Sequence, residues 1–562
     1  MTNITNDEFI ALFNSPNNPP LNDYIIEGNV EFNSSNYPHK PIYITNCHFR
    51  NQVLFESVTL DPNIFFGNGC GFEQSLLFKN CNSTSDSETS AGDSANLIVN
   101  SCTIGSLALL GNNFRNGVKF YSVELDSFAV NGLTSEKDLF LEKSTIKNIC
   151  IIRHIKLSQI KFFNCQLLNI TKIQNTSVEV GYFFDCKFIG MINISEGKFS
   201  ETLCFQNNKA EDYMFIDNID SEGALRIFNG NEFKKAIQID YYNKKTKISR
   251  GFNKIDLESS QFLGSMEIIG PDNISISSKI NQLIISGFLK GRINFTNFII
   301  KEAEITRSNA DTQILFNHVK FSKLIFNYFT NSGELQFLNM ESTGENDTSL
   351  EIIYSYLGKA QFLNASLDSF STIRIEHSIL SEIITSNVKW FSPEKLNQPL
   401  KNKNLDHLKN IRELFGQLKY AIEKQGNTIQ ALDFKRHEMS AYKNELDLKW
   451  KKNIKDWFVM FVNQSNDYGR DWTLPVVLAA TVTFMFYCFL IIIVEPVSTD
   501  WAFYDYGYVF FNLLNPLHTL DKLFPDTNIP NSFLVNALDF IYKIVISYLI
   551  FQTVSAFRKH IK

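Results

Sequence analysis

Short runs in which apolar and polar residues alternate dominate the first 391 residues. From residue 24 to residue 391 these runs are interrupted by Asn and Gly, and the whole chain contains 51 Phe residues. A period of two predicts β-strands, because successive side chains of a strand point to opposite faces. The clearest internal match is residues 162–167 (FFNCQL) against residues 183–188 (FFDCKF), 21 positions further on. The pattern therefore predicts short strands that recur with this spacing.

A repeat of this length predicts a solenoid, in which each turn hydrogen-bonds to the next and stacks like residues inside. We expect a right-handed parallel β-helix over residues 24–395. Phe163, Cys165 and Leu167 are predicted to share one face of a strand, with Asn164 in a position that suits a turn. Weaker copies of the motif begin at residues 44, 77, 98 and 315.

The first 23 residues are predicted to close the open end of this solenoid, since unpaired strand edges would recruit other chains. An amphipathic helix is expected over residues 7–14. Its apolar side would be formed by Phe9, Ile10, Leu12 and Phe13.

The hydrophobic period changes from two to nearly four after Ser392 and Pro393. Residues 396–456 are therefore predicted to form a helical connector, which Gly426 divides into two antiparallel helices. Each helix has one apolar stripe, formed by Leu405, Leu408, Ile411, Leu414, Phe415 and Leu418 in the first and by Ala431, Phe434, Met439 and Tyr442 in the second.

Residues 457–562 are predicted to be a membrane region with two spans. Residues 472–494 contain no charged side chain and are long enough, at ~1.5 Å per residue, to cross a hydrocarbon core of ~30 Å. The second span, residues 533–557, is less uniformly apolar. Lys and Arg flank the outer ends of the pair, whereas five of the six charged residues in the connecting segment, residues 495–531, are acidic. The positive-inside rule predicts a multi-pass protein of the inner (cytoplasmic) membrane with both termini in the cytoplasm.

Polar residues of the second span form a candidate site. Asn536, Asp539, Lys543 and Ser547 fall within an arc of about 80° at 100° per residue, and Gln552 lies nearly opposite. An ionisable group at the bilayer centre costs ~2.5–3.5 kcal/mol on insertion scales, so this stripe should face protein or water. Two interpretations stay open. Either Asp539 and Lys543 form an ion pair that holds the helices together, or the stripe lines an aqueous path between subunits of a homo-oligomer.

Aromatic residues mark the junction before the first span. Tyr468 and Trp472 lie where an aromatic belt would meet the membrane interface, and Gly469 and Arg470 lie between them. These four residues are the candidate membrane junction. Between the spans, an apolar run at residues 507–514 is too short to cross the bilayer and is expected to re-enter it or to lie along its surface.

Several short segments of the C-terminal part resemble a known family. Residues 465–472 (SNDYGRDW), 423–427 (EKQGN), 538–540 (LDF) and 552–558 (QTVSAFR) are similar to bacterial pentapeptide-repeat-containing membrane proteins. The resemblance covers about residues 405–562. It implies a β-helical protein whose C-terminal two-span region is ion-channel-like. Strict pentapeptide repeats are not kept, because the turns are irregular and richer in Phe.

Composition argues against other classes of function. Charged residues make up 20% of the chain and the formal net charge is −6, so nucleic acid is not an expected partner. Eight of the nine cysteines lie within the first 204 residues without a CxxC pair and are interpreted as reduced core residues. No cofactor, metal or catalytic residue is predicted. A β-helical polysaccharide-active enzyme is the least favoured class, because no pair of carboxylates recurs at the turn spacing.

The leading hypothesis is a membrane-anchored sensor or effector. Its β-helix would detect or assemble, its connector would transmit, and several helix pairs would oligomerise, with an ion-conducting pore as one outcome. The expected partners are the lipid bilayer, further copies of the chain and an unidentified protein or small-molecule trigger. A bacterial defence role would suit this layout by analogy of architecture. The alternative is a membrane-tethered β-helical scaffold for protein partners.

Overall fold

The chain divides into two compact units. Unit 1 comprises residues 1–378 and 385–397, and unit 2 comprises residues 379–384 and 398–562. The computed structural model describes residues 1–16, 21–38, 40–60, 63–83, 95–243, 248–272, 278–396, 405–448, 455–457, 460, 464–493, 503–524 and 532–557.

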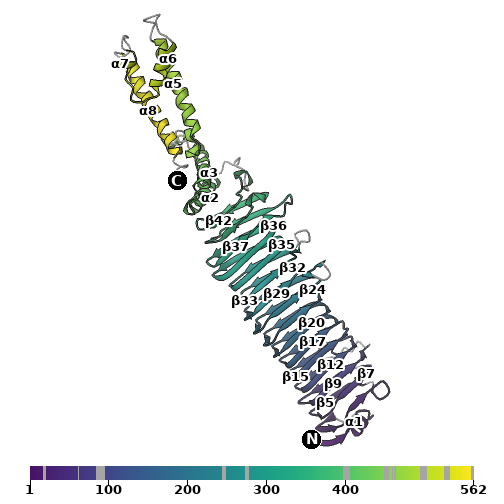
Figure 1. Cartoon of the computed structure of the whole chain (residues 1–562). Helices are drawn as coiled ribbons and strands as arrows, with labels where there is room; N and C mark the ends of the chain where they lie inside the picture. Colours follow the sequence, from purple (N-terminus) through teal and green to yellow (C-terminus); the bar gives the residue numbers. More distant parts are fainter. Residues whose placement is uncertain are drawn as a thin grey trace. The chain divides into compact units, whose positions relative to one another are not determined.

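Unit 1 is a parallel β-solenoid of about 16 turns (Figure 1). Among the described residues, 38 strands belong to one hydrogen-bonded sheet. The predicted parallel β-helix is confirmed, and its right-handed sense stays a prediction. The longer strands are β9 Gly71–Lys79, β12 Thr103–Leu110, β15 Glu124–Asn131, β17 Thr145–Arg153, β18 Lys156–Phe163, β21 Ser177–Phe184, β24 Lys198–Gln206, β27 Ser221–Phe228, β32 Phe252–Glu258, β33 Gln261–Ile269, β34 Ser278–Ser286, β35 Lys290–Asn309 and β36 Asp311–Asn331.

Like residues stack from turn to turn inside the solenoid. Strands β18, β21 and β24 pair in parallel, so that Phe183 lies between Phe162 and Phe205. The ring centroids are 5.3 and 5.1 Å apart, close to the ~4.8 Å between neighbouring strands. Phe162 pairs with Phe183, 21 residues further on, which confirms the repeat found in the sequence. A second stack consists of Phe295, Phe316, Phe337 and Phe362.

The strands that carry the first Phe stack, β18, β21 and β24, each end at a corner of the solenoid. The residue at each corner has left-handed backbone angles. Asn164 follows β18 with a φ of 54°, a conformation that Asn tolerates better than most residues with a side chain. The corner interrupts the alternation of faces. Phe162, Cys165 and Leu167 are therefore buried, whereas Phe163 lies on the outer face. The prediction that Phe163 shares the inner face with Cys165 is wrong for this reason.

The motif copies found in the sequence belong to two separate columns of corners. Strand pairing places Asn46, Ser101 and Asn164 in the first column. It places Asn80 and His318 in the second. All five residues have a positive φ. The sequence analysis treated these copies as one repeated motif. The structure corrects this interpretation, because the copies occupy two different corners of each turn.

Small polar side chains fill the inside of the corners. Asn208 accepts a hydrogen bond from the backbone N–H of Cys186 at 2.8 Å and donates one to the carbonyl of Phe183 at 2.9 Å. The thiol of Cys186 donates to the carbonyl of Phe162 at 3.4 Å. All nine cysteines lie among the described residues and are free, and the eight of unit 1 are buried. Burial raises the pKa of the Cys81 thiol to about 11, which keeps it protonated.

Asn208→Leu is expected to destabilise the solenoid by about 1–3 kcal/mol for each group left without a partner, here the N–H of Cys186 and the carbonyl of Phe183. The urea midpoint of the full chain in detergent, followed by circular dichroism, measures the change. The matched control is Asn207→Gly, because Gly also accepts the φ of 55° at this neighbouring corner position. Equal midpoints for the two variants would contradict the role assigned to Asn208.

An N-terminal helix packs on the first turn of the solenoid. Strand β1 (Thr2–Thr5) pairs with β3 (Tyr24–Glu27), and helix α1 (Asn6–Phe13) follows β1 directly. Thr5 and Glu8 cap the helix, since the hydroxyl of Thr5 accepts from the N–H of Glu8 and the carboxylate of Glu8 accepts from the N–H of Thr5. Phe9 and Phe13 are buried, so the helix covers apolar groups at this end.

Unit 2 contains the helical connector and the apolar helices. Its elements are α2 Leu405–Lys424, α3 Thr428–Leu448, η3 Gln464–Gly469, α5 Thr473–Ile493, α6 Phe503–Leu513, α7 Leu520–Leu523 and α8 Phe533–Phe557. Arg412 of α2 pairs with Glu445 of α3 at 2.8 Å, and Lys419 pairs with Glu438 at 2.7 Å. Pairs in this reversed order require antiparallel helices, which confirms the predicted hairpin.

Candidate functional site

Two helices among the described residues, α5 and α8, are long and apolar enough to span a membrane. Their 21 and 25 residues correspond to about 32 and 38 Å. Large apolar side chains of both helices are exposed: Phe484 by 57%, Met485 by 66%, Phe533 by 88% and Phe540 by 66%. A core helix of a soluble protein would bury such side chains. The two helices agree with the predicted spans to within one residue at each end.

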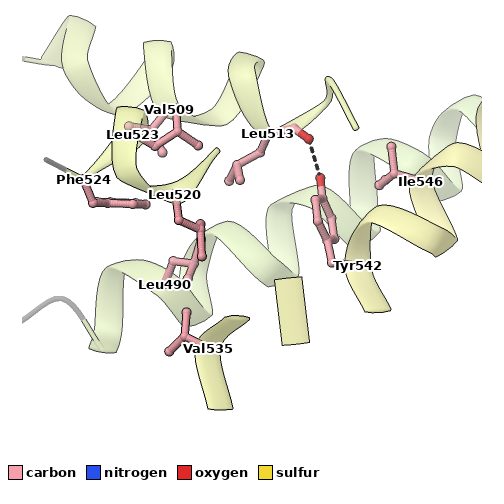
Figure 2. Close-up of a cluster of buried hydrophobic side chains, with 9 residues drawn as sticks. All are labelled: Leu490, Val509, Leu513, Leu520, Leu523, Phe524, Val535, Tyr542 and Ile546. Carbon is pink, nitrogen blue, oxygen red and sulfur yellow. Dashed lines mark hydrogen bonds between the residues drawn. The ribbon is translucent and has the colours of Figure 1, made fainter. Parts of the chain in front are cut away.

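Helices α6 and α7 pack on the two apolar helices (Figure 2). Tyr542 of α8 donates a hydrogen bond to the carbonyl of Leu513 at 2.9 Å, and its hydroxyl lies 2.8 Å from that of Thr483 on α5. The apolar run predicted at residues 507–514 is therefore mostly the C-terminal part of α6. The buried residues of this contact are Leu490, Val509, Leu513, Leu520, Leu523, Phe524, Val535, Tyr542 and Ile546.

A buried polar cluster also joins the segment between the spans to α8. Asp539 is at its centre, with Oδ1 2.8 Å from Nε2 of His518 and Oδ2 2.6 Å from Nζ of Lys543. The other ring nitrogen of His518, Nδ1, is 2.7 Å from the carbonyl oxygen of Asn515. The side chains of His518 and Asp539 are 2% and 7% exposed, and that of Lys543 is 27% exposed. Asp539 therefore contacts both His518 and Lys543 across this interface.

The four residues of the predicted stripe lie in different environments. Asp539 is turned into the helix pair, Lys543 is partly exposed, and Asn536 and Ser547 are exposed. We call Asn536, Lys543 and Ser547 the outer strip. Gln552, which the sequence places nearly opposite, is buried and bonded to the side chain of Asn466. Both sides of α8 thus carry polar residues. Asp539 pairs with Lys543, Gln552 bonds to Asn466, and the side-chain amide of Asn536 donates to the carbonyl of Ser532 at 3.1 Å.

Sequence reasoning missed His518, which precedes Asp539 by 21 residues and reaches it through tertiary packing. It also missed Asn466, whose partner Gln552 is 86 residues away. The one local signal for the contact between His518 and Asp539 was a histidine just after Asn515 and Pro516. That signal does not show which residue the histidine contacts. Neither pair has a spacing that helical or strand periodicity would reveal.

The candidate junction residues Tyr468, Gly469, Arg470 and Trp472 lie in η3 or just after it. Tyr468 is buried, and Gly469 has a φ of 93°, which favours glycine. Arg470 contacts Asp433 of α3 with 3.3 Å between Nε and Oδ1. The ring of Trp472 lies 4.7 Å from that of Phe557 at the end of α8. The junction therefore connects the helical hairpin to the apolar helices.

His437 of α3 gives unit 2 a pH-dependent stability. Burial lowers the pKa of its imidazole below the ordinary value of about 6.5, and Arg436 acts in the same direction. The unfolded chain then binds more protons than the folded chain, so this contribution to stability is present above about pH 6.5 and is lost as the pH falls below it. We expect the thermal midpoint of the full chain to decrease from about pH 7 to about pH 5. An equally large decrease in His437→Gln would contradict this assignment.

Comparison with protein-family models, with curated proteins and with solved structures gives no match for this chain. The resemblance to pentapeptide-repeat membrane proteins therefore stays a prediction. The offset between paired residues of successive turns varies, for example 20 residues from Ser278 to Phe298, 21 from Phe162 to Phe183 and 23 from Phe55 to Phe78, so a strict five-residue step is not kept throughout the solenoid. The fold and the apolar helix pair define a membrane-associated β-solenoid protein.

Proposed function

We propose that the chain is a membrane-anchored β-solenoid scaffold that self-associates through the outer strip of α8. The observation that supports the proposal is the outward placement of Asn536, Lys543 and Ser547 on a helix whose other exposed side chains are mostly apolar. Asn536 bonds to the carbonyl of Ser532 and Lys543 to Asp539, but the exposed surface of these polar groups is more stable against protein or water than against hydrocarbon. A second copy of the chain presents the same donors and acceptors at the same depth in the bilayer.

The environment of Asp539 favours a packed contact over a water-filled path. Both of its carboxylate oxygens are occupied within the unit, and the ammonium of Lys543 is 2.6 Å from one of them. The outer strip therefore presents one cation that already has a counter-ion, together with two neutral polar groups. Such groups suit hydrogen bonds between neighbouring transmembrane helices. The solenoid would then hold protein partners on the cytoplasmic side, as the positive-inside pattern predicts.

Cross-linking of the full chain in membranes tests the self-association. In a Cys488→Ala background, Ser547→Cys on the outer strip should form a disulfide-linked dimer on mild oxidation. Val545→Cys is the matched control, because it lies two residues away and about 160° around the helix at 100° per residue. Monomer in both variants, or equal dimer in both, would contradict the proposal.

An ion-conducting pore between copies is the second candidate, and the 27% exposure of the Lys543 side chain favours it. Water in such a path would hydrate the ammonium on the side away from Asp539. Planar-bilayer recording of the purified oligomer separates the two functions. Current that disappears when Asn536 and Ser547 are both replaced by Leu supports the pore. An oligomer that carries no current supports the scaffold.

A further inference from the structure

We infer that His518 and Asp539 form a proton-binding site, and that the bound proton holds residues 503–524 on α8. The inference goes beyond the proposed self-association and does not depend on it, because every group involved belongs to one chain. His518 lies just before α7, and Asp539 lies six residues into α8. The two side chains are nearly inaccessible to solvent.

Both ring nitrogens of His518 face hydrogen-bond acceptors. Nδ1 lies 2.7 Å from the carbonyl oxygen of Asn515, and Nε2 lies 2.8 Å from Oδ1 of Asp539. A neutral imidazole carries one N–H and can donate one of these two bonds. Two protons are therefore required, one on Nδ1 and one between Nε2 and Oδ1. The pair holds one proton more than a neutral imidazole beside a carboxylate.

The neighbours of Asp539 place the extra proton on His518. Lys543 donates to Oδ2 at 2.6 Å, and a ring N–H donates to Oδ1, so each carboxylate oxygen accepts from a donor. A carboxylate is an acceptor at both oxygens, whereas a carboxylic acid would have to donate from one of them. The arrangement is thus an imidazolium and an ammonium on the two oxygens of one carboxylate, which are charge-assisted bonds.

Other groups around the cluster do not supply this proton. The ring of Tyr542 on α8 lies 6.0 Å from that of His518, but its hydroxyl already donates to the carbonyl of Leu513. Thr483 of α5, which is neutral, contacts the hydroxyl of Tyr542. Asp521 and Lys522 of α7 are exposed. Among the side chains that the structure describes, the charged groups that contact His518 directly or through its partner are therefore Asp539 and Lys543.

Loss of the proton must remove one of the two bonds of His518. If the remaining N–H is on Nε2, the bond to Asn515 is lost, and if it is on Nδ1, the bond to Asp539 is lost. A hydrogen bond to a charged group is worth enough to change a local opening equilibrium by about 10-fold to 100-fold. Residues 503–524 should therefore open more often from α8 as the pH rises.

Hydrogen exchange of the full chain in detergent, followed by mass spectrometry from about pH 5 to about pH 8, tests the site. After correction for the intrinsic exchange rate, protection of residues 503–524 should fall by about 10-fold to 100-fold across this range. His518→Gln should abolish this dependence, because its amide can donate to Asp539 but does not gain or lose a proton. His437→Gln is the matched control and should keep the dependence of the parent chain.

A second variant keeps the test decisive if His518→Gln does not fold. Lys543→Gln removes the second cation from Asp539, so the pH at which residues 503–524 lose protection should move upward. Protection of residues 503–524 that does not change with pH in the parent chain would overturn the inference. An unchanged pH dependence in both His518→Gln and Lys543→Gln would also overturn it. Neither result bears on the disulfide cross-linking of Ser547→Cys.

Discussion

Asp539→Leu is expected to destabilise the apolar helix pair by about 3–5 kcal/mol. The substitution removes the acceptor of both His518 and Lys543 and leaves their polar atoms in a largely buried site. It also removes the contact between α8 and the ring of His518, while the hydrogen bond from Tyr542 to the carbonyl of Leu513 remains. Thermal unfolding of the full chain in detergent, followed by the helical circular-dichroism signal, measures the loss.

The matched control replaces all three members of the cluster, His518, Asp539 and Lys543, with Leu. An apolar replacement of a complete buried charge cluster is often neutral or stabilising, so this variant should recover most of the lost stability. Replacing Asp539 and Lys543 alone should recover less, because the ring of His518 then keeps a nitrogen without a partner. Asp539→Leu with the stability of the parent chain would show that the cluster does not hold the helices together.

Phe316→Ala is expected to lower the stability of the solenoid by about 3–5 kcal/mol. The side chain belongs to β36, is fully buried, and lies between Phe295 and Phe337 with ring centroids 5.1 Å from each. Removing it leaves a cavity that neighbouring turns cannot fill, because their hydrogen bonds fix the distance between strands. The urea midpoint of the full chain, followed by the strand signal in circular dichroism, reports the effect.

Phe288→Ala is the control for this prediction, since its side chain is 78% exposed. A surface substitution of this kind should change stability by less than about 0.5 kcal/mol. Similar midpoints for Phe316→Ala and Phe288→Ala would contradict the assignment of the Phe stack as the core of the solenoid.

The turn spacing of the solenoid was predictable because identical side chains stack on one another. Phe162 pairs with Phe183 in the structure, and the same two residues gave the repeat in the sequence. The two columns of corners could not be distinguished from the sequence. At both, a residue with positive φ precedes a small buried residue, as in Asn164 with Cys165 and Asn80 with Cys81. A local motif that occurs twice in each turn cannot indicate which corner it forms.

The candidate site was predictable only as far as a single helix determines it. The spacing of Asp539 and Lys543 gave their ion pair, which the structure contains at 2.6 Å. Which side of α8 is covered depends on α5, α6 and α7, so the inward orientation of Asp539 and the outward orientation of Ser547 required the tertiary structure. The contact of His518 with Asp539 is equally non-local, since the two residues are 21 positions apart and His518 lies outside α8.

Alkaline carbonate extraction of membranes that contain the full chain tests the membrane association of α5 and α8 most directly. A helix pair with this much exposed apolar surface should leave the full chain in the membrane pellet after carbonate and high salt, because removing surface electrostatics does not release a spanning helix. A chain that ends at residue 397, which keeps unit 1, should appear in the supernatant. Recovery of the full chain in the carbonate supernatant would contradict the account.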